Sequence, residues 1–189
     1  MDDYRDSAPA SRVLDTAARL FYSQGYTATG INQIINEAGV ARASFYQHFP
    51  SKKDLAVAYL EHRHEVWMKK LRDYLAVRST PGAQLEGLFD YLSEWLPSVD
   101  YRGCAFLNMA SEAPALGADI QSVIARHKSE LRSFVQEVVE RLEVPRPSEK
   151  ADVVYLLFEG AIVESQVVRD VWPIDAARRG TRQLLAAPE

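Results

Sequence analysis

Apolar residues recur every three to four positions along most of the chain, and no stretch alternates between apolar and polar residues as a half-buried strand does. The pattern therefore predicts an all-α protein. Three short helices are expected first, at residues 11–23, 30–38 and 42–49, and a long fourth helix follows Ser51. Gly25 is expected to end the first helix, Thr29 to cap the second and Ser51 to cap the fourth.

The rest of the chain predicts longer helices. They are expected at residues 79–96, around 104–111, from 118 to 142, from Ser148 through Val168, and from 175 to 186. Ser148 is expected to cap the fourth of these, and Trp172-Pro173 to break the chain before the last. The change in helix length predicts two domains, residues 1–52 and 53–189.

Composition narrows the class of protein. Hydrophobic residues make up 47% of the chain and charged residues 25%, which suits a globular core. No apolar run reaches the roughly 18 residues that a bilayer span requires, and the acidic start "MDDYRDSAPASR" lacks the apolar core of a signal peptide. The single cysteine, Cys104, excludes an internal disulfide framework. Together these features predict a soluble, cytoplasmic protein that does not contact a membrane.

The distribution of charge indicates a candidate function in one segment only. The formal net charge of −4 does not favour nucleic acid as a partner. The run "GVARASFYQHFPSKK", residues 39–53, nevertheless carries Arg42, Lys52 and Lys53 and no acidic residue. Three short helices with a glycine turn before the third follow the helix-turn-helix plan, in which a short helix enters the major groove of DNA. The segment is therefore a candidate DNA-binding surface.

The third short helix is expected to have one buried side and one side that faces DNA. Phe45 and Phe49 lie four residues apart and pack inward, whereas Ala43, Tyr46 and Gln47 share another face. Core packing alone explains the two phenylalanines but not the polar residues opposite them. Gln47 can form two hydrogen bonds with an adenine edge, which would make it a residue that reads sequence.

The neighbouring polar groups suit other contacts with DNA. Arg42 and Ser44 can reach bases or phosphates. Phosphate contacts, which fix register and carry little sequence information, are expected from Tyr46, His48 and Lys52. Thr27 or Thr29, with the free backbone amides that begin the second helix at Gly30, can hold a further phosphate.

The order Thr-Gly-Ile, followed by Ala-Gly-Val-Ala-Arg-Ala-Ser-Phe-Tyr-Gln-His-Phe-Pro-Ser-Lys, closely resembles the DNA-binding domain of TetR/AcrR-family regulators over about residues 11–60. The resemblance implies an all-helical homodimer with about nine helices per subunit, whose last two long helices pair with those of the partner. It also implies a small-molecule pocket in the second domain. By motif position, the residues that touch DNA are Arg42, Ala43, Ser44, Tyr46, Gln47, His48 and Lys52. Ala41 departs from the pattern, because many relatives have a serine or threonine there that caps the recognition helix.

The helix around residues 153–168 has apolar residues on more than one face. Two interpretations stay open: a dimer surface, or an internal core helix. A dimer would hold two recognition helices about 34–36 Å apart, or a multiple of this helical turn, and would read a palindrome.

Eight residues of the second domain are candidates for a ligand pocket. They are Trp67, Phe89, Trp95, Cys104, Phe106, Met109, Tyr155 and Phe158. They can line an apolar cavity for a small apolar or aromatic effector, or they can form ordinary core. In the first case, the effector would favour a conformation of the protein that releases DNA.

Cys104 supports a second kind of signal. The run "RGCAFLNMASE" resembles a segment in a branch of the same family, where a glycine-cysteine pair opens the sixth helix and the cysteine of some members senses electrophiles or oxidants. A helix N-terminus and the nearby Arg102 would lower the pKa of such a thiol. A free cysteine can equally be a buried, inert hydrophobic residue.

Other classes of protein have less support. The chain contains four histidines but no HExxH motif, no glycine-rich phosphate loop and no cysteine pair, so neither catalysis nor a metal or other cofactor is expected. His62 and His64 lie two residues apart on a helix and face different directions, and His127 lies on a mostly apolar face. A scaffold protein would leave the cationic segment unexplained. We therefore expect a DNA-binding transcriptional regulator, and the family resemblance favours a repressor.

Overall fold

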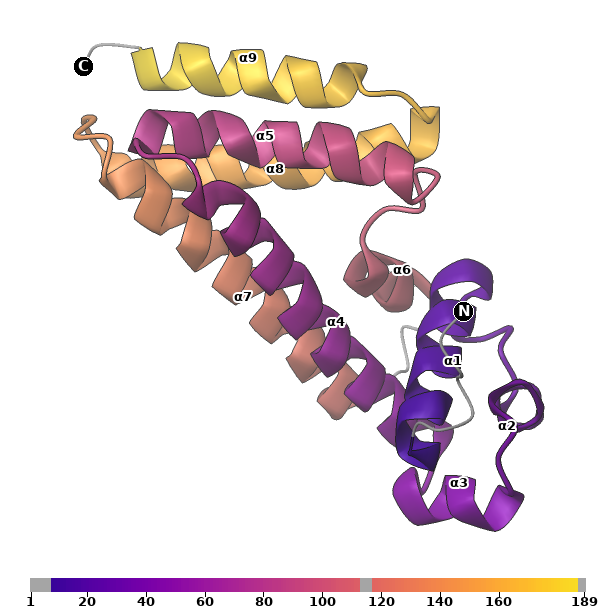
Figure 1. Ribbon diagram of the computed structural model, residues 1–189. Coiled ribbons are helices and arrows are strands. Elements are labelled where there is room, and N and C mark those ends of the chain that lie inside the picture. Colours follow the sequence, from indigo (N-terminus) through magenta and orange to yellow (C-terminus); the bar gives the residue numbers. More distant parts are fainter. Residues whose placement is uncertain (1–7, 113–116, 187–189) are drawn as a thin grey trace. The chain divides into compact units, whose positions relative to one another are not determined.

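The structure is a computed structural model that describes residues 8–112 and 117–186, and within these residues it contains nine α-helices and no strand (Figure 1). The all-α prediction is confirmed. The helices are α1 (Pro9–Gln24), α2 (Ile31–Ala38), α3 (Arg42–His48), α4 (Lys52–Ala76), α5 (Pro81–Ser98), α6 (Ala105–Glu112), α7 (Ala118–Glu140), α8 (Pro147–Val168) and α9 (Trp172–Ala186).

The described residues form two compact units. The first contains the chain up to Glu65 together with the described part of residues 105–125, and the second contains residues 66–104 and those from Arg126 onward. Helices α4 and α7 each contribute to both units, whereas α6 belongs wholly to the first. The functional boundary at residue 52 stays a prediction.

The core of the first unit forms where α1, α2 and α3 pack together. Val13 of α1, Ile34 of α2 and Phe45 of α3 are each fully buried. Gly39 turns the chain between α2 and α3 with a φ of 62°, a left-handed conformation that side chains with a Cβ disfavour. The apolar faces predicted from the sequence therefore meet in one small core, and the turn fixes α3 against it.

The second unit is built on contacts among α5, α8 and α9. Arg182 of α9 forms a two-pronged ion pair with Glu86 of α5, with N–O distances of 2.6 and 2.7 Å. Arg132 of α7 pairs in the same way with Asp152 of α8. Phe89 and Phe158 are buried between α5 and α8, with ring centroids 6.3 Å apart.

Helix starts were predicted less well than the helices themselves. Ser51 caps α4 as expected, because its hydroxyl accepts from the backbone N–H of Asp54. The cap assigned to Thr29 is wrong, because α2 begins after Gly30 and no side chain caps it. The cap assigned to Ser148 is also wrong, because α8 begins at Pro147, a residue well suited to a first helical position.

The break before the last helix also lies elsewhere than predicted. Arg169, in a left-handed conformation with a φ of 56°, ends α8. Trp172 and Pro173 do not interrupt the chain but open α9, as proline is able to do because its missing N–H has no partner in a first turn.

Candidate nucleic-acid interface

Helix α3 has the two sides that the sequence predicts. Phe45 is fully buried, and its ring contacts that of the half-buried Phe49, with centroids 6.2 Å apart. On the other side, 39% of Tyr46 is exposed, and Gln47 and His48 are exposed as well. The polar residues are therefore free to meet a ligand while the phenylalanines hold the helix in place.

The other predicted DNA contacts on this segment are accessible to different degrees. Arg42 and Ala43 are exposed, and Ser44 and Lys52 are half-buried. The guanidinium carbon of Arg42 lies 5.9 Å from the centre of the Tyr46 ring, so the two side chains lie on one surface. The N-cap residue Ala41 provides no side-chain hydrogen bond, as its departure from the family pattern implied.

The turn between α1 and α2 differs from expectation. Thr29 is fully buried, and its hydroxyl donates to the carbonyl oxygen of Gly25 at 2.7 Å, so this side chain does not face a phosphate. The side chain of Thr27 is exposed, but its backbone N–H donates to Glu112 Oε2 at 2.9 Å. Gly30 is exposed at the start of α2, with open space where a Cβ would lie. Of the three groups predicted here, Gly30 and the Thr27 side chain remain accessible.

Two lysines complete this surface. The Lys52 ammonium lies 4.2 Å from the centre of the Tyr26 ring, a cation–π contact. Burial lowers the pKa of Lys52, and the charge of Glu112 opposes that effect. Lys53 forms an ion pair with Asp119 at the start of α7, and the hydrogen bond to that carboxylate raises the pKa of Lys53. Lys53 is therefore already paired with a carboxylate of this chain, and Lys52 is influenced by the charge of another.

The residues predicted to line a ligand pocket are buried or half-buried, but they do not form one group. Trp67 contacts the rings of Tyr91, Trp95 and His127 at centroid distances of 5.6–5.7 Å. Cys104 is buried, with Lys128 Nζ 3.6 Å from its sulfur, and Tyr155 is half-buried. Phe106 and Met109 are buried on α6, in the first compact unit.

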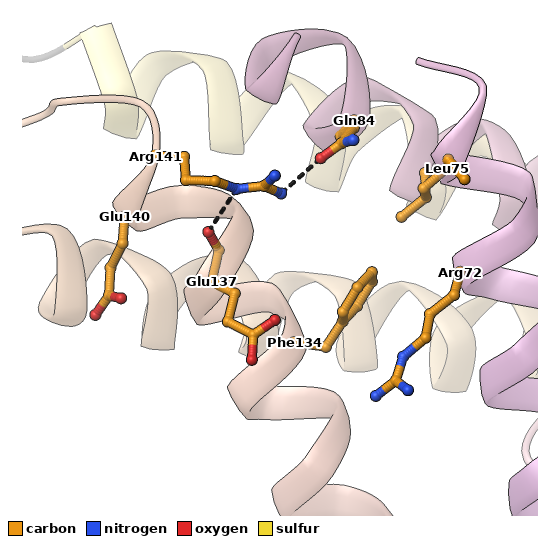
Figure 2. A pocket seen from close by; sticks show the side chains of 8 residues that line it. Arg72, Leu75, Gln84, Phe134, Glu137, Glu140 and Arg141 are labelled. Carbon is orange, nitrogen blue, oxygen red and sulfur yellow. Dashed lines mark hydrogen bonds between the residues drawn. The ribbon is translucent and has the colours of Figure 1, made fainter. Parts of the chain in front are cut away.

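Two of the cavities among the described residues lie in the second unit. The larger, of about 580 Å³, is shown in Figure 2 and is lined by Arg72, Leu75, Ala76, Gln84, Phe134, Glu137, Glu140 and Arg141. In Figure 2 the Arg141 guanidinium donates to Gln84 and to the Glu137 carbonyl. The smaller, of about 330 Å³, includes Tyr74, Tyr91 and Trp95. Of the predicted pocket residues, Trp95 alone lines either of these two cavities.

Sequence reasoning missed the lining of the larger cavity. Phe134 lies in the apolar register of α7, which favours a core position over a ligand site, yet it is only half-buried. The guanidinium carbon of Arg72 lies 5.7 Å from the centre of its ring. A charged side chain over an aromatic ring on a different helix has no signal in sequence spacing.

Residues 8–112 and 117–186 contain no cluster of three or more histidine, cysteine, aspartate or glutamate side chains suited to a metal ion. None of their helices is both long and apolar enough to span a bilayer.

Comparison with known proteins agrees with this geometry. Residues 13–59 match the profile of the bacterial regulatory proteins of the tetR family. The HTH-type transcriptional regulator LmrA of Bacillus subtilis is 28% identical over 175 residues, covering 90% of this chain and 92% of LmrA. The HTH-type transcriptional repressor NemR of Escherichia coli is 22% identical over 199 residues, which cover 100% of this chain and 99% of NemR.

Solved structures share the whole fold. SCO4454, a TetR-family transcriptional regulator from Streptomyces coelicolor, superposes with a TM-score of 0.86 and 26% identity, over 96% of each chain. The match over residues 13–59 includes α3, and the superposition covers nearly the whole chain. Residues 13–59 form a DNA-binding domain of the tetR family, and the chain, which is similar to TetR-family proteins over nearly its whole length, is a helix-turn-helix, DNA-binding transcriptional regulator.

Proposed function

We propose that the protein is a dimeric repressor that binds a palindromic operator and is released from it by a small-molecule effector. The observation that carries the DNA-binding part is the exposed row of polar side chains on α3, held by the buried Phe45. Gln47 reads a base, and Arg42 and Ser44 contact bases or phosphates. Phosphates are held by Tyr46, His48 and Lys52, with Gly30 and the Thr27 side chain at the start of α2.

The dimer is supported by the outer face of α8. This face carries exposed apolar residues at intervals of three and four, namely Val153, Leu156, Val163 and Val167, with the exposed Gly160 between Leu156 and Val163. A stripe with this spacing is the pattern by which two helices pack against each other, and a glycine lets their backbones approach. The inner face of the same helix is buried within the protomer, at Val154, Phe158 and Ile162. The buried face agrees with the interpretation as a core helix, and the exposed face supports the proposal of a dimer surface.

An effector would bind in the second unit. The cavity lined by Tyr74, Tyr91 and Trp95 offers aromatic surface to a small apolar or aromatic molecule. The Trp67 indole N–H, which is buried beside Tyr91 and Trp95, meets no acceptor among the described residues. Trp67 does not line this cavity, so a ligand with a hydrogen-bond acceptor would satisfy this donor if it entered between the rings of Tyr91 and Trp95. Its binding would favour a conformation with low affinity for the operator.

Binding to the DNA upstream of the protein's own gene tests the proposal. Because phosphate contacts release counterions, the affinity should fall on the order of a hundredfold between 50 and 200 mM salt. Binding should nevertheless survive an excess of random DNA. Binding that random DNA abolishes, or that salt leaves unchanged, would contradict the proposal.

A second candidate function, sensing of electrophiles or oxidants, is favoured by the surroundings of Cys104. Lys128 Nζ lies 3.6 Å from the sulfur and 2.5 Å from Glu159 Oε2. Burial acts to lower the pKa of Lys128, but Cys104 and Glu159 outweigh it and the pKa is raised, so the lysine stays charged. A cation at this distance stabilises the thiolate, which is the reactive form of cysteine. NemR, one of whose solved structures is of its reduced form, is similar to this chain over its whole length.

The sensing function predicts that Cys104→Ser loses the release of DNA by hypochlorite or a reactive carbonyl. Since Cys104 is the single cysteine of the chain, alkylation by iodoacetamide followed by mass spectrometry reports its reactivity directly. Lys128→Met should slow this alkylation, because it removes the cation that lies 3.6 Å from the sulfur and favours the reactive thiolate. Arg126→Met, which removes a cation from the same helix, serves as the matched control. A Cys104→Ser protein with its full response would end this candidate.

A further inference from the structure

The end of α6 and the start of α7 bring two carboxylates to the lysines that follow the recognition helix. All of these groups belong to the first compact unit. Glu112, the last residue of α6, accepts a hydrogen bond from the backbone N–H of Thr27 at 2.9 Å. Asp119, in the first turn of α7, forms an ion pair with Lys53.

The Glu112 carboxylate lies in a defined position in the turn between α1 and α2. A Cβ atom placed on Gly25 would lie 2.5 Å from Glu112 Oε1 and 2.7 Å from Oε2, closer than real contacts allow. Gly25 also has a φ of 96°, which side chains with a Cβ disfavour. Glycine at this position therefore leaves space for the carboxylate, which sits beside residues 25–27.

Lys52 lies against the same turn. Its ammonium is 4.2 Å from the centre of the Tyr26 ring, and Tyr26 stands between the two residues that contact Glu112. The charge of Glu112 acts to raise the pKa of Lys52 against the opposing effect of burial. The negative charge of Glu112 therefore stabilises the charged Lys52 side chain in the position that it has in this structure.

The two lysines are two of the three cations in the segment from Gly39 to Lys53. Ion pairing with a carboxylate and ion pairing with a DNA phosphate use the same ammonium group. A lysine that is attracted to a carboxylate of its own chain must weaken that attraction when it moves to a phosphate, so the carboxylate reduces the net gain on DNA binding.

We propose that Glu112 and Asp119 are intramolecular counter-ions that compete with DNA phosphates for Lys52 and Lys53. The affinity for DNA is thereby set from the end of α6 and the start of α7, which no sequence motif for DNA contact includes. The inference rests on the proposed function, in which Lys52 contacts phosphate, and extends that contact to Lys53.

The test measures the affinity of the full-length protein for a 40-base-pair duplex of random sequence at about 50 mM salt, since phosphate contacts do not depend on sequence. Glu112→Gln and Asp119→Asn remove the charges and keep an oxygen that accepts hydrogen bonds, so the turn at Thr27 retains its acceptor. Each variant should bind the duplex about two- to fivefold more tightly, the range expected for the loss of an exposed ion pair. Asp73→Asn is the matched control, because Asp73 is an exposed carboxylate paired with a lysine, Lys69, outside this segment.

The same substitutions are then measured in proteins that lack the partner lysine. In a Lys52→Gln background, Glu112→Gln should change the affinity less than about 1.5-fold, which is about the scatter of such a measurement. Asp119→Asn should likewise have little effect in a Lys53→Gln background. A gain that persists without the lysine, a gain equal to that of Asp73→Asn, or no gain at all would overturn the inference. If the wild-type protein does not bind the duplex at low salt, the proposed function itself fails.

Discussion

Leu156→Asp should separate the protein into monomers and weaken operator binding by at least about a hundredfold, the low end of the gain from linking two binding sites. Leu156 is 65% exposed in the protomer, so a carboxylate there leaves the core of the second unit unchanged. In a dimer packed through α8, the same carboxylate would be buried without a partner. A two-fold axis would also place it near its own copy.

Sedimentation at micromolar concentration and operator binding measure the two consequences separately. Val77→Asp is the matched control, because Val77 is a large apolar residue that is 83% exposed but lies after the end of α4 and outside the stripe on α8. The control should remain a dimer and bind as the wild type does. A Leu156→Asp protein that still sediments as a dimer would assign the interface to another surface.

Substitutions of Gln47 and Lys52 should distinguish base reading from phosphate contact. Gln47→Ala should lose discrimination at one base position of each half-site, at a cost of about 1–3 kcal/mol per half-site for the preferred base. Affinity for operators that already differ at that position should hardly change. The reason is geometric: Gln47 is exposed on α3, and its amide can both donate to and accept from one base edge.

Lys52→Ala should have the opposite signature. It should weaken binding to all sequences alike and flatten the dependence of log affinity on log salt by about one unit per half-site. Binding curves on a panel of single-base operator variants at several salt concentrations distinguish the two proteins. If Lys52→Ala altered base preference and Gln47→Ala altered only the salt dependence, the roles assigned here would be reversed.

The sequence predicted the helices well because their apolar faces are periodic, and Phe45 shows why. Its spacing from Phe49 predicted an inward-facing pair, and the structure buries Phe45 completely. Helix starts were less predictable, because a hydroxyl residue near a boundary has competing partners. Thr29 is such a case, since its hydroxyl donates to Gly25 and the helix begins after Gly30 without a side-chain cap.

The candidate site also contains residues that the sequence could predict and contacts that it could not. Residues of α3 lie on one continuous helix, so their spacing alone placed Tyr46, Gln47 and His48 on the exposed side. Contacts between distant segments had no such signal. The bond from Thr27 to Glu112 joins residues 85 positions apart, and the contact of Lys128 with Cys104 joins residues 24 apart on different segments. Such pairs become visible only when the fold is known.

A dimer of this protein should read one DNA duplex with its two recognition helices. Selection of bound DNA from a random pool, followed by sequencing of the recovered fragments, measures whether it does. We expect a palindrome whose half-sites are centred one helical turn, about 10–10.5 base pairs, or a small multiple of this apart. Recovery of a single unrepeated motif, or of no enriched sequence at all, would show that the two helices do not act on one duplex.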